Sequence, residues 1–221
     1  MKKNPKNMSI QITTEQIKEL RDSTGISVMQ CKRALEEARG DIKKALAILK
    51  KTSSDIALKK VNREVKNGRV SVKTERGKAV LVSLHCETDF VAKNEDFVNL
   101  LDKLTDKTLL EGAEKMKTNS KDMIDAIIQK TGENIQLGDA YEVSGDVLGT
   151  YVHNNKTGAI VSLEGGNAEL AKDVAMHVVA MQPEGIPELL DQAFIKNSEE
   201  TVSQLMEREK AKIKEIKRYS I

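Results

Sequence analysis

The spacing of apolar positions divides the chain into a helical beginning and a longer part that mixes strands with helices. Three short helical patterns follow one another over residues 12–52. Each opens with a residue that caps helices well, and these are Thr13, Ser27 and Asp41. Gly25 and Gly40 follow the first two patterns. Glycine readily adopts the left-handed conformation that ends a helix, so these residues indicate where the first two helices end. The pattern predicts a three-helix bundle, close to the lower size limit for an independent core.

Residues 53–69 differ from the bundle in charge. They are mostly basic and polar, with a thin apolar stripe at helical spacing formed by Leu58, Val61 and Val65. This pattern predicts a basic connecting helix with a solvated face. An RNA-binding role for residues 50–69 is an alternative, and it would show itself as a steep salt dependence of RNA affinity.

From Val70 onwards the apolar period changes from that of a helix to that of a strand. Residues 70–84 predict a hairpin that turns at Arg76-Gly77 and returns as a buried strand. Apolar helices follow around Phe97 and after Ser120, and residues 134–144 predict a third strand.

This order of elements then recurs. Residues 149–163 resemble residues 68–84, and both hairpins end in Val-Ser-Leu. The expected helices over 168–181 and from Ser198 to about Lys212 follow the second hairpin, and a strand over 213–221 follows them. A shared order of this length indicates duplication rather than two hairpins that merely look alike.

These segments predict an α+β fold. We expect a polar tail over 1–11, the bundle over 12–52, the basic connecting helix over 53–69, and core halves over 70–145 and 146–221. Each half should hold a small antiparallel sheet with helices packed on it.

Composition and charge exclude several classes of protein. Lys+Arg 36 against Asp+Glu 34 gives a net charge of +2, too balanced for a general polyanion binder. With Tyr 3, Phe 3 and no Trp, the chain is poorly suited to stacking on single-stranded bases. It has no apolar run long enough for a membrane span, and its basic start lacks the apolar stretch of a signal peptide. Two cysteines make no disulfide framework, so we expect a cytoplasmic protein with reduced thiols.

No residues form a convincing catalytic or metal-binding motif. His85 and Cys86 are neighbours on a predicted strand, so their side chains should point to opposite faces and His85 cannot readily act as a base for Cys86. Cys31, His153 and His177 lack the spacing of metal ligands. The Gly165-Gly166 turn lacks the lysine of a phosphate-binding loop. We therefore expect no enzyme activity, no cofactor and no metal, although a thiol enzyme using Cys86 is an alternative.

The most informative segment follows the buried strand of the first half. Phe90 lies in it among Asp89, Lys93 and Asn94, outside the apolar stripe that begins at Phe97. One interpretation places Phe90 in the core beside a capped turn. The other makes it an exposed aromatic anchor for a partner.

Residues 88–94, Thr-Asp-Phe-Val-Ala-Lys-Asn, resemble the central motif of the bacterial elongation factor Ts family. Other segments resemble that family in the same order. They are Ile17–Gly25, Met29–Leu35, Gly40–Ile42, Gly132–Ile135, Gly145–Gly149, Tyr151–His153, Met176–Val178, Gln192–Phe194 and Thr201–Leu205. The resemblance covers residues 12–221, with Ala193 where the family usually has proline.

This resemblance implies a guanine-nucleotide exchange factor that binds elongation factor Tu, with GDP bound and without nucleotide, during translation elongation. It implies that Thr88, Asp89, Phe90 and Val91 form a wedge that enters between two helices near the Mg²⁺ and phosphate site of Tu. Because GDP is held largely through its phosphates and Mg²⁺, disturbing that site should speed its release.

The resemblance also implies further contacts with Tu. The bundle is expected to have a ubiquitin-associated-like fold that docks on the GTPase domain, and the second core half to reach the third domain of Tu. The residues expected to bind the partner are Lys18, Met29, Lys32, Ile135 and His153. A binding module for another protein chain is the alternative, with residues 12–50 as the functional end.

One departure from the family concerns the oligomeric state. Many members carry a long helical hairpin, which can support dimerisation, after the helix that contains Met176-His177. Here Pro183–Pro187 leads almost directly into Glu188, which leaves no room for that hairpin. We therefore expect a monomer that forms a one-to-one complex with Tu, without a membrane or nucleic-acid partner.

Overall fold

The computed structural model describes residues 12–221, and the predicted polar tail over 1–11 lies outside the described residues. The chain forms two compact units. The smaller holds the described residues up to Asn62 together with 125–133, and the larger holds 63–124 and 134–221. Helices and antiparallel sheets both occur, which confirms the predicted α+β class. Within 12–221, none of the helices combines the length and apolar character needed to cross a membrane.

The smaller unit is built on three helices, α1 (Thr14–Thr24), α2 (Val28–Glu37) and α3 (Ile42–Leu58). Thr13 forms the predicted capping box of α1, and Gly25 ends it with φ 70°. Small and aliphatic side chains fill the centre of the bundle. They are Leu20, Ile26, Cys31, Ala34, Leu35, Ala38, Ala45 and Leu49.

The basic segment departs from its prediction as a helix over 53–69. Helix α3 ends at Leu58, and turns follow until the first strand starts at Asn67. Leu58 and Val61 are 65% and 53% exposed, so no buried apolar face supports a longer helix. A later segment completes this unit instead, because Oγ of Ser54 donates to Oδ2 of Asp125 at 2.8 Å.

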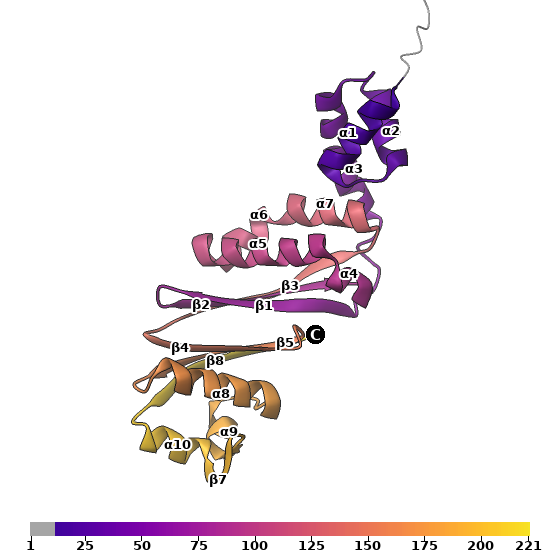
Figure 1. Ribbon diagram of the computed structural model, residues 1–221. Coiled ribbons are helices and arrows are strands. Elements are labelled where there is room, and N and C mark those ends of the chain that lie inside the picture. Colours follow the sequence, from indigo (N-terminus) through magenta and orange to yellow (C-terminus); the bar gives the residue numbers. More distant parts are fainter. Residues whose placement is uncertain (1–11) are drawn as a thin grey trace, which may run out of the picture. The chain divides into compact units, whose positions relative to one another are not determined.

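The larger unit contains two three-stranded antiparallel sheets of matching design (Figure 1). The first has the order β1-β2-β3 and the second β4-β5-β8, so in each the second strand of a hairpin lies at the centre. The strands are β1 (Asn67–Glu75), β2 (Lys78–Cys86), β3 (Ile135–Ser144), β4 (Val147–His153), β5 (Thr157–Glu164) and β8 (Lys212–Ser220). The matching order agrees with the predicted duplication.

The two sheets share one apolar cluster and carry helices on their other faces. Val70, Ala79, Leu81, Val143 and Ile160, drawn from both sheets, form the cluster between them. The sequence of layers in this unit is therefore helix, sheet, sheet, helix (Figure 1). The central strand β2 is buried on both faces, which explains its nearly continuous apolar sequence.

The first half has four helices after its hairpin. They are α4 (Asp89–Lys93), α5 (Glu95–Glu111), α6 (Ala113–Asn119) and α7 (Lys121–Thr131). Helix α5 packs on β1 and β2, and it buries Phe97 completely. From Asp125 onwards, which is most of its length, α7 belongs to the smaller unit.

The second half has α8 (Ala168–Met181), α9 (Ile186–Asp191), the short hairpin of β6 (Ala193–Phe194) and β7 (Asn197–Thr201), and α10 (Val202–Arg208). Helix α8 has the predicted bounds. Only residues 182–185 separate it from α9, so no long helical hairpin lies there.

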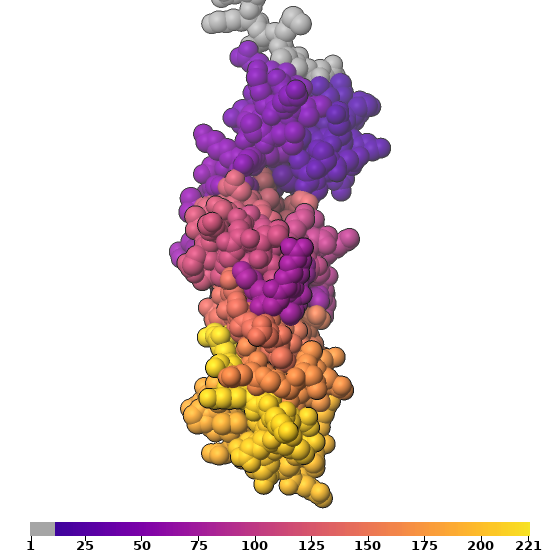
Figure 2. Space-filling view, turned by 90° about the vertical axis from the view of Figure 1, so that its left-hand side faces the viewer, coloured from indigo at the N-terminus to yellow at the C-terminus, as the bar shows by residue number. Residues whose placement is uncertain are grey.

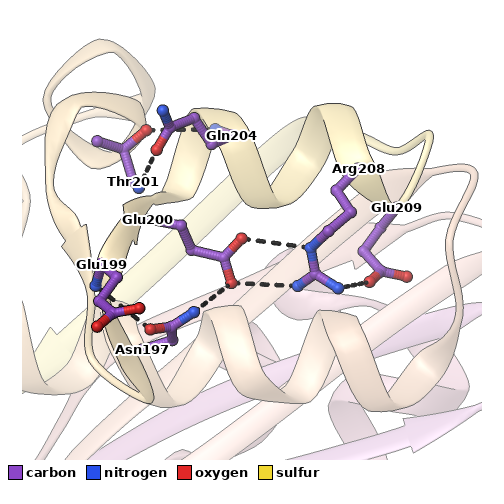
Figure 3. A network of polar contacts seen from close by, with 7 residues as sticks. All are labelled: Asn197, Glu199, Glu200, Thr201, Gln204, Arg208 and Glu209. Atoms are coloured by element: carbon purple, nitrogen blue, oxygen red, sulfur yellow. Dashed lines mark hydrogen bonds and ion pairs between the residues drawn. The ribbon is translucent and has the colours of Figure 1, made fainter.

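The helix predicted to start at Ser198 starts four residues later. Thr201 caps α10 through a capping box with Gln204, and the residues before it form β7 (Figure 3). Arg208 on α10 bonds the side chain of Glu200 through two guanidinium nitrogens, at 3.3 and 3.1 Å. This fork anchors the β6–β7 hairpin to α10.

One glycine allows the second sheet and its helix to approach closely. A Cβ atom on Gly149 of β4 would lie 1.9 Å from the carbonyl carbon of Ala171 in α8. Any side chain at this position would therefore push α8 away from the sheet.

Candidate functional site

The chain passes from the end of β2 into α4 through a tightly bonded turn. Cys86, the last residue of β2, is buried, and its Sγ donates to the carbonyl oxygen of Thr88 at 3.1 Å. The hydroxyl of Thr88 accepts a hydrogen bond from the amide of Val91 at 3.3 Å and so caps α4. The thiol therefore has a structural role in setting where α4 begins.

Helix α4 presents its aromatic residue to solvent. Phe90 is 81% exposed, whereas Ala92 on the same short helix is 4% exposed. Val91 is half-buried, and Ala92 anchors the helix to the core. The interpretation that places Phe90 in the core is wrong, because the single turn of α4 points that ring away from the sheet.

An ion pair lies on the same helix as Phe90. Oδ2 of Asp89 accepts from Nζ of Lys93 at 2.7 Å, one helical turn away. The hydrogen bond and the charge of Lys93 lower the pKa of Asp89, and Lys156 adds a smaller effect of the same sign. Asp89 is thus a carboxylate at neutral pH, beside an exposed aromatic ring.

A second exposed residue lies at the same end of the core. His153 ends β4, and its Nδ1 and Nε2 lie 3.4 Å from the hydroxyl of Tyr151 and 3.0 Å from Nδ2 of Asn154. The turn after β4 is bonded to the first sheet, because the amide of Val70 donates to the carbonyl oxygen of Asn155 at 2.8 Å. Since Val70 lies near the start of β1 and α4 follows the end of β2, this turn and α4 lie at one end of the sheets (Figure 1). Figure 2 shows the opposite end, where β1 turns into β2.

Ile135 occupies a different environment from the other expected contact residues. It starts β3, pairs with Cys86 in the sheet and is only 3% exposed. The adjacent Asn134 amide donates to Oε1 of Glu87 at 2.6 Å. The buried side chain of Ile135 therefore supports the turn before α4 and has no surface to offer a partner.

The bundle exposes a small apolar group at the start of α2. Met29 and Val28 are 62% and 49% exposed. Lys18 on α1 and Lys32 on α2 are exposed as well, and Lys32 lies 3.9 Å from a carboxylate oxygen of Glu36. Val28 is not among the predicted contact residues, although an apolar residue directly after the cap Ser27 was a signal for it.

The larger unit brings together His85 and Tyr219, a pair that the sequence pattern did not predict. Nε2 of His85 lies 2.7 Å from the hydroxyl of Tyr219 in β8. His85 and Cys86 act on opposite faces of β2, as the strand alternation predicted. Among residues 12–221, no three His, Cys, Asp or Glu side chains are grouped so that they could hold a metal ion.

Comparison with known proteins identifies relatives of the chain. A family model described as Elongation factor TS matches residues 87–188. Elongation factor Ts of Hahella chejuensis is 41% identical over 197 residues, which is 85% of this chain and 69% of the relative. The protein of the same name from Pseudomonas fluorescens is 41% identical over 78% of this chain and 61% of the relative. That from Pseudomonas putida is 38% identical over 90% of this chain and 67% of the relative.

Proposed function

Because the chain belongs to the elongation factor Ts family, we propose that it is a guanine-nucleotide exchange factor for elongation factor Tu in translation elongation. The observation that carries this proposal is the exposed ring of Phe90 on a short helix whose Ala92 is buried in the core. A free aromatic ring on a rigid base is suited to entering a groove on a partner.

In this proposal Thr88, Asp89, Phe90 and Val91 act as a wedge. A phenylalanine brings roughly 150–250 Å² of surface, mostly apolar, into a groove. Thr88 caps the helix, and the carboxylate of Asp89 enters the partner beside the ring. The wedge is placed near the Mg²⁺ and phosphate site of Tu, where small displacements weaken the hold on GDP. No bond is made or broken by this chain, so it acts as an exchange factor rather than an enzyme.

Nucleotide exchange requires that the nucleotide and the exchange factor weaken each other's binding to Tu by the same factor. Weakening the binding of GDP to Tu about 10⁴-fold corresponds to a coupling free energy of about 5.5 kcal/mol. That is more than a single ring can supply, so we assign further contacts to exposed residues elsewhere. They are Lys18, Met29 and Lys32 of the bundle and His153 of the second half.

We further propose that the protein works in the cytoplasm as a monomer, in a one-to-one complex with Tu that is GDP-bound or nucleotide-free. One chain holds both sheets of the larger unit, so it can supply both core contacts to Tu by itself. The short connection over 182–185 omits the helical hairpin that supports dimers in other members of the family.

Release of fluorescent GDP from Tu tests the proposal. Adding the protein at increasing concentration, with excess unlabelled GDP present, should raise the release rate to a plateau. A matched addition of the Phe90→Ala variant controls for non-specific effects. A release rate that does not respond to the unmodified protein would contradict the proposed function.

A further inference from the structure

The residue before Cys86 connects the wedge-bearing half to the second half. His85 lies on the face of β2 opposite to Cys86, so its ring points towards the second sheet. There its Nε2 lies 2.7 Å from the hydroxyl of Tyr219, and the two rings meet edge to face with centroids 5.9 Å apart. The pair thus spans the two sheets only three residues before Thr88, the cap of α4.

Two further contacts converge on the same place. The backbone amide of Ile221, two residues after Tyr219, donates to the carbonyl oxygen of Lys156 at 3.0 Å. The carbonyl oxygen of Asn155, the residue before Lys156, accepts a hydrogen bond from the amide of Val70 in β1 at 2.8 Å. The turn that follows His153 is therefore bonded both to the first sheet and to Ile221, the residue directly after the strand that carries Tyr219.

Electrostatics agree with this geometry. The hydrogen bond and charge of Lys93 lower the pKa of Asp89, and the positive charge of Lys156 in the β4–β5 turn adds to this in the same direction. The polar pair of His85 and Tyr219 lies at the edge of the apolar cluster between the sheets, in which Tyr219 packs. Within this unit, the contacts place the two exposed residues Phe90 and His153 on one connected framework.

We propose that His85 and Tyr219 are positioning residues, whose hydrogen bond fixes α4 with its Phe90 relative to the second half of the core. This inference rests on the proposed exchange function and adds to it how the contacts of the two halves act together. Loss of the bond leaves both sheets formed but lets α4 move. Binding to Tu through the bundle and His153 is then retained, while the ring reaches its groove less often.

Three variants test this assignment. Tyr219→Phe removes only the hydroxyl, and His85→Gln keeps a side-chain nitrogen near the position of Nε2. Tyr141→Phe is the matched control, because its hydroxyl bonds Asp139 on the same strand at 3.0 Å and does not join the halves. Thermal unfolding of each variant checks that the fold is kept.

The first readout is the rate of GDP release from Tu as a function of protein concentration. We expect Tyr219→Phe to lower the plateau rate about fivefold, the change in an equilibrium that one neutral hydrogen bond typically causes. The half-saturating concentration should stay within about twofold, because the other contacts with Tu are intact. Addition of His85→Gln to Tyr219→Phe should lower the plateau no further, because the hydroxyl that either side chain at position 85 would contact is already absent.

The second readout needs no partner. Hydrogen exchange at the amides of Val91 and Ala92, which bond to Thr88 within α4, should be faster in Tyr219→Phe and unchanged in Tyr141→Phe. Equal rates of hydrogen exchange in Tyr219→Phe and Tyr141→Phe would overturn the positioning role. An equal fall in the plateau rate of GDP release in these two variants would overturn it as well. If the unmodified protein fails to speed GDP release but hydrogen exchange still differs between Tyr219→Phe and Tyr141→Phe, the proposed function fails and the positioning role stands.

Discussion

Phe90 and Phe97 lie seven residues apart on consecutive helices, yet the ring of Phe90 is 81% exposed and that of Phe97 is fully buried. The two helices meet at Asn94, which ends α4 and caps α5. This junction lets one short segment bury one ring in the core and expose the other to solvent.

Replacing each phenylalanine by alanine should separate these roles. Phe90→Ala should leave thermal unfolding nearly unchanged and lower the plateau rate of GDP release at least tenfold, because an exposed ring contributes little to the core. Phe97→Ala should cost about 3–5 kcal/mol of unfolding free energy, measured by urea unfolding. A Phe90→Ala protein that unfolds more easily but still promotes release would contradict the assignment of the wedge.

His153→Ala should weaken binding to Tu without preventing exchange at saturation. The residue is exposed at the end of β4, and Phe90 remains in place to act on the nucleotide site. We expect the half-saturating concentration to rise about five- to tenfold, as for loss of one or two polar contacts, with the plateau preserved. Titration calorimetry with Tu measures the affinity, and equal values for variant and parent would count against this contact.

The stability of the second half should fall in mild acid. His177 is buried, its Nε2 donates to Oε1 of Gln192 at 2.9 Å, and its Nδ1 accepts from the amide of Ile195 at 3.2 Å. Burial lowers the pKa of His177 below its ordinary value of 6.5, and the bond to Gln192 offsets only part of that shift. The unfolded chain therefore binds a proton at His177 more readily than the folded chain does. The contribution of neutral His177 to the free energy of unfolding is fully present above about pH 6.5 and decreases as the pH falls below that value.

Urea unfolding at pH 7.5 and pH 5.5 measures this effect. Burial also lowers the pKa of His85, so both histidines contribute with the same sign. His177→Gln should unfold more easily at pH 7.5 but lose less stability between the two pH values than the parent. A pH dependence that is unchanged in this variant would show that His177 is not the group responsible.

Gly149→Ala should disrupt the packing of α8 on the second sheet. The added Cβ would lie 1.9 Å from the carbonyl carbon of Ala171, so the helix must move. We expect a loss of about 3 kcal/mol in unfolding free energy. Gly185→Ala is the control, because a Cβ there meets its nearest atom, Cδ of Pro187, at 3.7 Å with φ at −171°. Equal stability of the two variants would contradict this explanation of Gly149.

The complex with Tu should contain one copy of each protein. Light scattering of the purified protein and of its mixture with Tu at micromolar concentration gives the two masses. We expect the mass of a monomer and then that of a one-to-one complex. A two-plus-two assembly would show that a sheet edge or another surface joins two chains.

Local sequence determined most of the elements of this protein. The capping residues Thr13 and Asp41, the left-handed Gly25 and the change of apolar period at Val70 all act over a few residues, so they can be recognised without the fold. The repeated hairpin likewise indicated two matching halves. The motif around Phe90 indicated a partner site, but its residues alone left open whether the ring is buried or exposed.

Only the tertiary structure decided the relationships between distant segments. It exposes Phe90, buries Ile135 beneath the same turn, and pairs His85 with Tyr219 from 134 residues further along the chain. It also ends α3 at Leu58 and replaces the start of a predicted helix at Ser198 by β7. The physical reason is that burial and hydrogen bonding depend on which surfaces meet, and those surfaces come from elements far apart in sequence.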